Sequence, residues 1–321
     1  MGTSTGRDLH IDQNLTQIAL NFTPANIIVD AIAPIVTVQK ATDLYPVYSR
    51  AEILALEESL RAPGSEAKKI TRSVSSAAYA VKNYALAMDI TVEDRANVDA
   101  AYEATLFGSA AQYLRWKLDA GWEQRVVSAV TSVSNVSTGF TVASAWNGTG
   151  DPFSQVSQVI EQVQATTGLR PISVLLGWKA WALMKRNQTM RNIISGVNNG
   201  GGLVTRQQVQ SLLEVDRFLV SEMFYNTANE AQPEALTPSM DDDVLVYFAP
   251  LQASRDAPSF MYSFRQNVPG VPSLVAERHP YDSRRKVETV EVGFYQDEKV
   301  TGSPYAALLL GVTVSASGGL A

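Results

Sequence analysis

The feature that most constrains this chain is a proline-free stretch of about forty residues, from Thr91 to about Val130. Alanine, leucine and glutamate, which favour helices, are plentiful in it. Thr91 and Asp94 have the spacing of a capping box, in which two side chains bond each other's backbone N–H groups. The stretch therefore predicts one long helix, about 55–60 Å in length at roughly 1.5 Å per residue.

An apolar stripe winds around this predicted helix, because a four-residue step drifts by about 40° on a helix of 3.6 residues per turn. We therefore expect a helix that lies across a sheet and turns its other sides to other elements. Heptad spacing is not sustained, so a coiled coil is the less favoured alternative. The stripe consists of Leu106, Ala110, Leu114, Leu118, Trp122, Val126 and Val130.

Composition excludes several classes of protein. The chain has 321 residues with 45% hydrophobic content, enough for a substantial core. It has no cysteine, which excludes disulfides, thiol catalysis and cysteine-based zinc sites. The sequence has no uncharged apolar run long enough to span a membrane. The N-terminus also lacks a hydrophobic signal region, so we expect the chain to stay in the cytoplasm. A net charge of −6 argues against tight nucleic-acid binding by the whole surface, but leaves weak contact by one face open.

The residues before the helix predict two extended regions. Residues 1–48 are expected to form an arm, because β-branched residues are interrupted by Pro24 and Pro34. Residues 49–90 predict a long β-hairpin excursion with its turn near Pro63. Its distal part is small and polar, so it cannot make its own core and either stays mobile or lies on a neighbouring molecule.

The residues after the helix predict a compact domain and a terminal strand pair. Residues 132–150 are a connector, and residues 151–265 alternate helices with buried strands, which is typical of an α/β domain. A proline-rich and then basic segment follows, and the strands near 290–294 and 305–314 are expected to pair and pack under the long helix. Within the α/β domain, helices are expected at 152–167, 178–191 and 206–213, strands at 172–176, 217–220 and 244–248, and a loop at 226–243.

Motifs for catalysis and phosphate binding are absent from the sequence, including GxSxG, HExxH, the Walker loop and GxGxxG. His279, between an arginine and a proline, favours a surface histidine over a general base. Asp241–Asp243 could offer oxygens to a divalent cation, but the spacing is not that of a calcium loop, so a solvated turn is favoured. Trp178 and Trp181 are expected in a core rather than stacked on a base or sugar. The sequence therefore predicts no enzyme, no catalytic residue, no cofactor and no metal site.

The order of arm, excursion, long helix, α/β domain and terminal strands resembles the major capsid proteins of tailed bacteriophages, which have the Hong Kong 97-type capsid fold. The resemblance covers nearly the whole chain, and the order and patterning carry it rather than a sharp motif. The segments that carry it are PANIIVDAIAPIVTVQKATDLYPVYSR (24–50), SAAYAVKNYALAMDITVEDRANVD (76–99), VTRQQVQSLLEVDRFLVSEMFYNTA (204–228) and VEVGFYQDEKVTGSPYAALLLGVTV (290–314).

This resemblance implies an α+β fold with five named parts. They are an N-terminal arm (1–48), an extended β-hairpin loop or E-loop (49–90), the spine helix and connector of the peripheral P-domain (91–150), an α/β axial A-domain (151–265), and the P-domain loop and terminal strands (266–321).

The resemblance also implies a structural protein that self-assembles into hexamers and pentamers of an icosahedral phage head enclosing double-stranded DNA. The chain would be assembled in the host bacterial cytoplasm and located in the virion. Its implied partners are other copies of itself, scaffolding, portal and decoration proteins, and packaged DNA through weak non-specific contact, with no membrane. Some relatives begin with a cleaved scaffolding region; here the arm begins almost at Met1, so a separate scaffolding protein or none is expected.

The resemblance further implies that the E-loop lies over an adjacent subunit and that the segment 278–286 lies near three-fold contacts. Some members of the family cross-link a loop lysine to an asparagine of a neighbour. No asparagine occurs between 268 and 321, so no cross-link is expected. The candidates for intersubunit contact are Arg61, Lys68, Lys69, Arg72, Arg278, Arg284, Arg285 and Lys286.

Two other functions stay open at this point. An encapsulin-like protein nanocompartment shares the capsid fold but carries enzyme cargo, and particle contents would distinguish it. A soluble α/β enzyme or binding protein with an unrecognised site would instead elute as a monomer with a pocket for a ligand.

Overall fold

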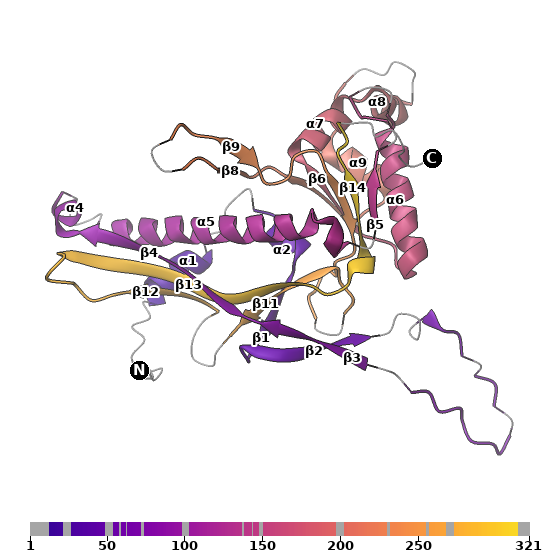
Figure 1. Ribbon diagram of the computed structural model, residues 1–321, viewed down its shortest axis with the longest axis horizontal. Coiled ribbons are helices and arrows are strands. Elements are labelled where there is room, and N and C mark those ends of the chain that lie inside the picture. Colours follow the sequence, from indigo (N-terminus) through magenta and orange to yellow (C-terminus); the bar gives the residue numbers. More distant parts are fainter. Residues whose placement is uncertain are drawn as a thin grey trace.

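A long helix, α5 (Glu103–Val130), lies along a five-stranded sheet and organises the molecule in the computed structural model (Figure 1). With 28 residues, α5 is about 42 Å long at roughly 1.5 Å per residue. The structure describes residues 13–21, 27–48, 54–57, 59–61, 63–71, 74–97, 103–136, 138–142, 144–147, 150–196, 202–229, 232–254, 257–267 and 273–313.

The predicted winding stripe is confirmed, but the prediction of one continuous helix from Thr91 is wrong. From Leu114 to Val130 the predicted stripe residues are buried, and Phe107 and Val127 join them on adjacent faces. A separate short helix, α4 (Val92–Ala96), precedes α5 and ends at Asn97, a residue of low helix propensity. The predicted capping box is present at the start of α4.

The five-stranded sheet is built around its longest strand, β13. Residues 290–294 of β13 pair with both β12 and β4, so these two strands lie on opposite edges of β13. β11 pairs with the last part of β13, and β1 runs parallel to β11. The strands are β1 (Ile35–Val38), β4 (Lys82–Thr91), β11 (Met261–Gln266), β12 (Leu274–Arg278) and β13 (Val287–Val300).

The arm is not wholly extended, because the structure places two helices in it. In α1 (Gln13–Asn21), Leu15 and Ala19 are four residues apart and both are buried in the core beside α5. The second helix is α2 (Val29–Ile32). The nine-residue length of α1 gives a periodic signal too short to separate from that of an irregular arm.

The hairpin of the excursion differs from the prediction. Its base is a two-stranded ribbon in which β2 (Thr42–Tyr48) pairs with β3 (Val74–Ala80). The predicted return limb past residue 81 is β4, which belongs to the five-stranded sheet. The ribbon therefore starts earlier and ends earlier than residues 49–90.

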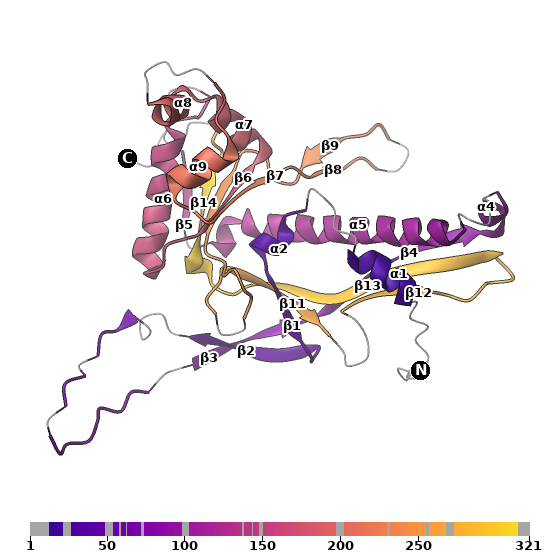
Figure 2. The ribbon, with the colours of Figure 1, turned by 180° about the vertical axis from the view of Figure 1, so that it is seen from behind.

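A second sheet, with strand order β5-β14-β10-β6-β7, forms the other half of the molecule (Figures 1 and 2). Its strands are β5 (Thr138–Thr141), β6 (Ser173–Gly177), β7 (Arg217–Ser221), β10 (Val244–Tyr247) and β14 (Ala306–Leu310). The other elements of this half are α6 (Pro152–Thr167), α7 (Trp178–Arg186), α8 (Gln188–Ser195), α9 (Arg206–Leu213), β8 (Phe224–Asn226), β9 (Leu236–Pro238) and two 3₁₀ turns, Val133–Asn135 and Ser303–Tyr305.

Local signals at helix ends predict α6 and α9 correctly. Asp151 caps α6, and Gly168 ends it in the left-handed conformation with a φ of +73°. Thr205 caps α9 in a capping box. The predicted helix over 178–191 is wrong, because Asn187 separates α7 from α8 and caps α8 with its own side chain. The predicted loop at 226–243 contains β9, which pairs with β8.

The assignment of the last strand to the sheet under α5 is wrong. β14 pairs with β10 and β5 instead of β13, so the end of the region 266–321 belongs to the second sheet. β14 and β10 lie between two cores: Leu245 and Leu308 face the core of α5, while Val246 and Leu309 face the core of α6 to α9. A run of apolar residues is typical of a strand covered on both faces, whereas the alternation in β13 is typical of one covered face.

In the described part of the chain, no helix is both long and apolar enough to cross a membrane.

A buried acid joins the arm to α5. The Oε2 atom of Glu123 accepts a hydrogen bond of 2.9 Å from the backbone N–H of Ile28, and the side chain is fully buried. Its Oε1 atom has no hydrogen-bond partner among the described residues. Burial raises the pKa of Glu123 to about 7, although the Ile28 bond lowers it.

This acid predicts a specific pH dependence. Between pH 4.5, the ordinary pKa of glutamate, and about pH 7, the folded chain holds a proton that the unfolded chain has lost. The folded state therefore loses stability as pH rises through this window, by about 3 kcal/mol if the whole shift acts on folding. We expect Glu123→Gln to remove this part of the pH dependence, measured as the difference between denaturant unfolding curves of the two proteins from pH 4 to 8. A difference that stays constant with pH would contradict the assignment. Burial also raises the pKa of Asp119, but Asp119 is present in both proteins, so its contribution to the pH dependence cancels in the difference between their unfolding free energies.

Candidate subunit interface

The loop beyond the β2–β3 ribbon has almost no support from the rest of the chain. It extends away from both sheets in Figures 1 and 2, and every described residue between 54 and 71 is exposed. Leu56 is 102% exposed and Leu60 is 88% exposed, and Ile70 is also largely exposed. Large apolar side chains gathered on an unsupported segment mark a surface that is covered by a partner.

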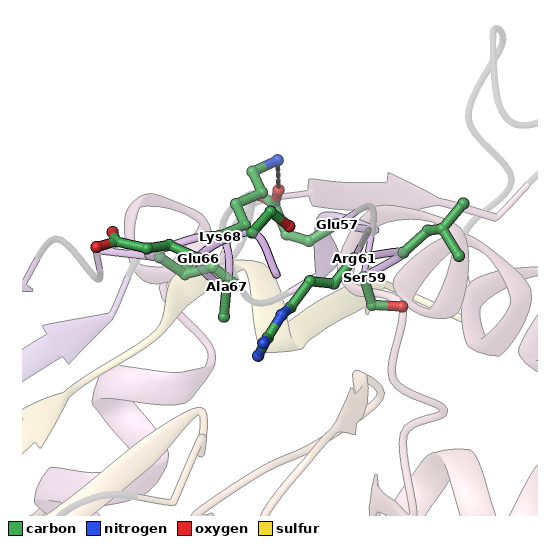
Figure 3. A pocket seen from close by; sticks show the side chains of 9 residues that line it. Glu57, Ser59, Arg61, Glu66, Ala67 and Lys68 are labelled. Atoms are coloured by element: carbon green, nitrogen blue, oxygen red, sulfur yellow. Dashed lines mark hydrogen bonds and ion pairs between the residues drawn. The ribbon is translucent and has the colours of Figure 1, made fainter. Parts of the chain in front are cut away.

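A hollow of about 450 Å³ separates the two limbs of this loop (Figure 3). Lys68 Nζ and Glu57 Oε2 form an ion pair of 2.6 Å between the limbs. Both side chains are well exposed, so the pair contributes only about 0–1 kcal/mol. The hollow is a gap between weakly joined limbs rather than an enclosed ligand site, since its lining side chains are all exposed. These are Glu57, Ser59, Leu60, Arg61, Ser65, Glu66, Ala67, Lys68 and Ile70.

The other predicted cations of the loop are placed as follows. Arg61 lines the hollow and has no carboxylate partner in the described ranges. Lys69 lies 3.8 Å from Glu66, and both side chains are almost fully exposed, so this pair leaves Lys69 available to another carboxylate. Arg72 lies outside the residues that the structure describes.

The structure divides the predicted basic cluster at 278–286 into two kinds of residue. Arg278 lies 3.9 Å from the ring centroid of Phe107, and its Nε donates to Glu288 Oε2 at 2.7 Å. Arg285 pairs with Asp89 of β4. These two arginines therefore hold parts of their own chain together.

The remaining two cations sit on the turn between β12 and β13. Arg284 donates its backbone N–H to Asp282 Oδ1 at 2.8 Å, and Lys286 has the left-handed φ of 55° that closes the turn. Both side chains are exposed, and neither has a carboxylate partner in the described part of the chain. Of the basic cluster, Arg284 and Lys286 are thus the ones free for a contact outside the chain.

This division predicts different effects of alanine substitutions. Arg278→Ala removes the ring contact and leaves half-buried Glu288 with fewer donors, so we expect the unfolding free energy to fall by about 1–3 kcal/mol. The matched control, Arg284→Ala, is expected to change it by less than about 0.5 kcal/mol, because its exposed side chain has no ion pair with the residues that the structure describes. Denaturant unfolding of the unassembled chain measures both; equal losses would contradict the division.

His279 and two of the aspartates at 241–243, which the sequence offered as candidate catalytic or metal-binding residues, bond to other residues of their own chain. His279 directly follows β12 and is half-buried, and its Nε2 lies 2.9 Å from Glu291 Oε2. The solvated turn expected at Asp241–Asp243 is wrong for Asp243, which accepts a 2.9 Å bond from Gly311 N–H and whose pKa is raised by burial. Asp242 accepts a bond from the hydroxyl of Thr313. These carboxylates hold the segment after β14, and no metal-binding group of three acidic or histidine side chains occurs among the described residues.

The two tryptophans of α7 have different surroundings. Trp181 is buried against Phe218, with ring centroids 5.5 Å apart, as the sequence predicts. Trp178 is 38% exposed, and its ring lies 5.7 Å from that of Phe224 in β8, centroid to centroid, so its core assignment is wrong. Sequence reasoning missed the exposed pair Trp178 and Phe224, because the β8–β9 ribbon that brings Phe224 there was expected to be a loop.

Comparison with known proteins gives matches only at the level of structure. Neither a protein-family model nor a curated protein sequence matches the chain. A phage-related protein from Bordetella bronchiseptica RB50 matches with a TM-score of 0.76 and 17% identity, over 95% of this chain and 98% of that one. The capsid of cyanophage P-SCSP1u matches with a TM-score of 0.57 and 14% identity, over 96% and 92%. A virus-like particle from Pyrococcus furiosus matches with a TM-score of 0.57 and 8% identity, over 92% and 98%.

These matches extend over nearly the whole of each chain, as the sequence resemblance implies. Each of the three covers at least 92% of this chain and at least 92% of the other protein, so the likeness includes both halves of the molecule rather than one sheet alone. The chain therefore has the mixed helix-and-sheet fold of phage major capsid proteins, the Hong Kong 97-type fold.

Proposed function

We propose that this chain is the structural major capsid protein of a tailed phage. Copies assemble as hexamers and pentamers into an icosahedral head that encloses double-stranded DNA, and the protein acts in the virion as a shell component rather than as an enzyme. The observation that carries the proposal is the exposed, leucine-bearing loop at 54–71, which the fold holds away from its own core. Within a shell, a neighbouring copy covers that surface.

The parts of a capsid subunit are assigned to elements of this fold as follows. Helix α5 is the spine helix, and the sheet of β4, β13, β12 and β11 is the P-domain sheet. The second sheet with α6 to α9 is the A-domain, to which β14 also belongs because of its pairing. The β2–β3 ribbon with its loop is the E-loop, and the residues up to β2 are the N-terminal arm.

Charge supports weak rather than tight contact with packaged DNA. The net charge is −6, and Arg278 and Arg285 are already paired within the chain. A wall that bound DNA through many phosphate contacts would oppose its movement during packaging and ejection. Scaffolding, portal and decoration proteins are further partners in this proposal, and assembly takes place in the cytoplasm of the bacterial host.

An encapsulin-like nanocompartment is the second candidate, because a virus-like particle from Pyrococcus furiosus shares this fold over almost its whole length. The two candidates differ in what the shell contains. Particles purified from the natural source and treated with nuclease are expected to retain double-stranded DNA of uniform length. Particles that contain a second protein and no protected DNA would contradict the phage assignment and favour the nanocompartment.

A further inference from the structure

The short helix α2 is held by groups from both halves of the molecule. On one side, Ile28, the residue before α2, donates its backbone N–H to Glu123 Oε2 of α5 at 2.9 Å. On the other side, the carbonyl oxygen of Ala31 accepts bonds from the hydroxyl of Tyr247 on β10 at 3.0 Å and from Arg217 Nη1 on β7 at 3.3 Å. Figure 2 shows α2 where α5 approaches the second sheet. Helix α2 therefore ties the long helix to the second sheet.

The position of α2 depends on these contacts and on burial rather than on the helix itself. With four residues, α2 is far too short to be stable as an isolated helix. Val29, Ile32 and Ala33 are fully buried in the core that α5 shares with the first sheet and with one face of the second. A change at one contact of α2 therefore acts on the whole segment.

The contact with α5 ends on a side chain that is poorly accommodated as an anion. Glu123 is 0% exposed, and its Oε1 atom has no hydrogen-bond partner among the described residues. The basic side chains of α5 on either side of it are engaged elsewhere: Arg115 Nε donates to Asp119 Oδ2 at 2.6 Å, and Arg125 pairs with Glu298 at 2.8 Å. An ionised Glu123 would thus be a buried charge without an ion pair in the described part of the chain.

The other charged and titratable groups around this site do not supply that missing partner. Arg265 of β11 donates its Nε to Gln296 Oε1 at 2.8 Å, and Arg217 bonds the carbonyl of α2. Asp30 on α2 and Asp119 on α5 are acids and add no cation. The groups on α5, on α2 and on the strands packed around them here are Asp30, Tyr84, Arg115, Asp119, Arg125, Arg217, Tyr247, Arg265 and Glu298.

We propose that the segment 28–33 is a clasp between α5 and the second sheet, and that it opens when Glu123 loses its proton. Water must reach the ionised carboxylate, and displacement of a four-residue helix disrupts fewer contacts than displacement of α5 or of a strand. Opening exposes Val29 and Ile32 and removes the tie between the two halves, while both sheets stay folded. The device belongs to the single chain and is independent of what a shell contains.

The pH range of opening follows from the two forms of the acid. In the closed form the pKa of Glu123 is about 7, and in the open form water returns this pKa to its ordinary value of 4.5. The open form therefore binds fewer protons between these values, so the opening equilibrium rises with pH and levels off above pH 7. From pH 5.5 to 8 the rise is about thirtyfold if the ordinary pKa is fully restored.

Hydrogen–deuterium exchange of the unassembled chain measures this opening. The amides of Ile28, Ala31 and Ala33, which are hydrogen-bonded in the closed form, are followed from pH 5.5 to 8 and corrected for the intrinsic pH dependence of exchange. We expect their protection to fall by about thirtyfold, while amides of α5 and β10 keep theirs. Glu123→Gln keeps an oxygen for the Ile28 N–H but cannot ionise, so we expect it to abolish the fall.

A matched control, Tyr247→Phe, separates the tie from the titration. It removes the bond to the Ala31 carbonyl, and burial holds the pKa of Tyr247 above its ordinary 10, so no group that titrates in this range is lost. We expect faster exchange in the clasp by about two- to tenfold at every pH, with the pH dependence unchanged.

Three results would overturn the clasp. The first is the same fall in protection with pH in Glu123→Gln as in the natural chain, which would show that another group is responsible. The second is an equal fall in α2, α5 and β10, which would show that the whole fold responds. The third is unaltered exchange in Tyr247→Phe, which would show that the second sheet does not hold α2.

Discussion

Removal of residues 60–71, with the limbs joined by a short Gly-Ser turn, is expected to leave a chain that folds but forms no closed shells. The loop contributes almost nothing to its own subunit, because its described side chains are exposed and the ion pair that joins its limbs, Lys68–Glu57, is also exposed. The exposed apolar side chains gain burial only from a neighbour, at about 25 cal/mol per Å² of apolar surface covered. Far-ultraviolet circular dichroism tests folding, and electron microscopy tests shell closure.

A length-matched control separates the loss of side chains from the shortening of the loop. Leu56→Ser, Leu60→Ser and Ile70→Ser together keep the loop at full length but remove its large apolar side chains. We expect this variant also to yield capsomers or aberrant particles in place of closed shells. Normal shells of unchanged thermal stability from the deletion variant would show that the loop is not an intersubunit clamp.

Trp122→Ala is expected to destabilise the folded chain more than Arg278→Ala does. Trp122 is 1% exposed, and its Nε1 donates to Ser263 Oγ at 3.2 Å. Its ring lies 6.5 Å from that of Phe294 and 4.8 Å from the guanidinium carbon of Arg265. Loss of this side chain leaves a cavity between α5 and the sheet and removes the ring that contacts the buried guanidinium of Arg265. The unfolding free energy should therefore fall by about 3–5 kcal/mol.

The matched control for this substitution lies on another side of the same helix. Trp116 is 40% exposed, its ring stacks on Tyr113, and the amine of Lys117 lies over it. We expect Trp116→Ala to cost less than about 1 kcal/mol, because little buried surface is lost. Denaturant unfolding of the unassembled chain gives both values. Losses of equal size would contradict the placement of α5 on the sheet.

Much of the fold could be predicted because its signals are local. The caps at Thr91, Asp151 and Thr205 and the stripe along α5 depend on residues within one or two turns of each other. The pairing of β14 with β10 depends on residues about sixty positions apart in the sequence, and no local pattern reports it. The sequence showed that β14 is an apolar strand but not which sheet contains it.

The candidate interface was predictable in composition but not in detail. The charges at 278–286 were visible in the sequence, and only the fold shows that Phe107 and Glu288 engage Arg278 while Asp89 engages Arg285. The partners come from α5, β13 and β4, which are distant along the chain.

The oligomeric state of the purified chain tests the shell function most directly. Sedimentation of the protein at micromolar concentration, with electron microscopy of the same sample, measures whether copies associate and whether the products close. We expect pentamers, hexamers and closed shells of uniform size, with the loop at 54–71 resistant to protease only in the assembled fraction. A stable monomer of 34.8 kDa, with the same loop resistant to protease, would contradict the shell function.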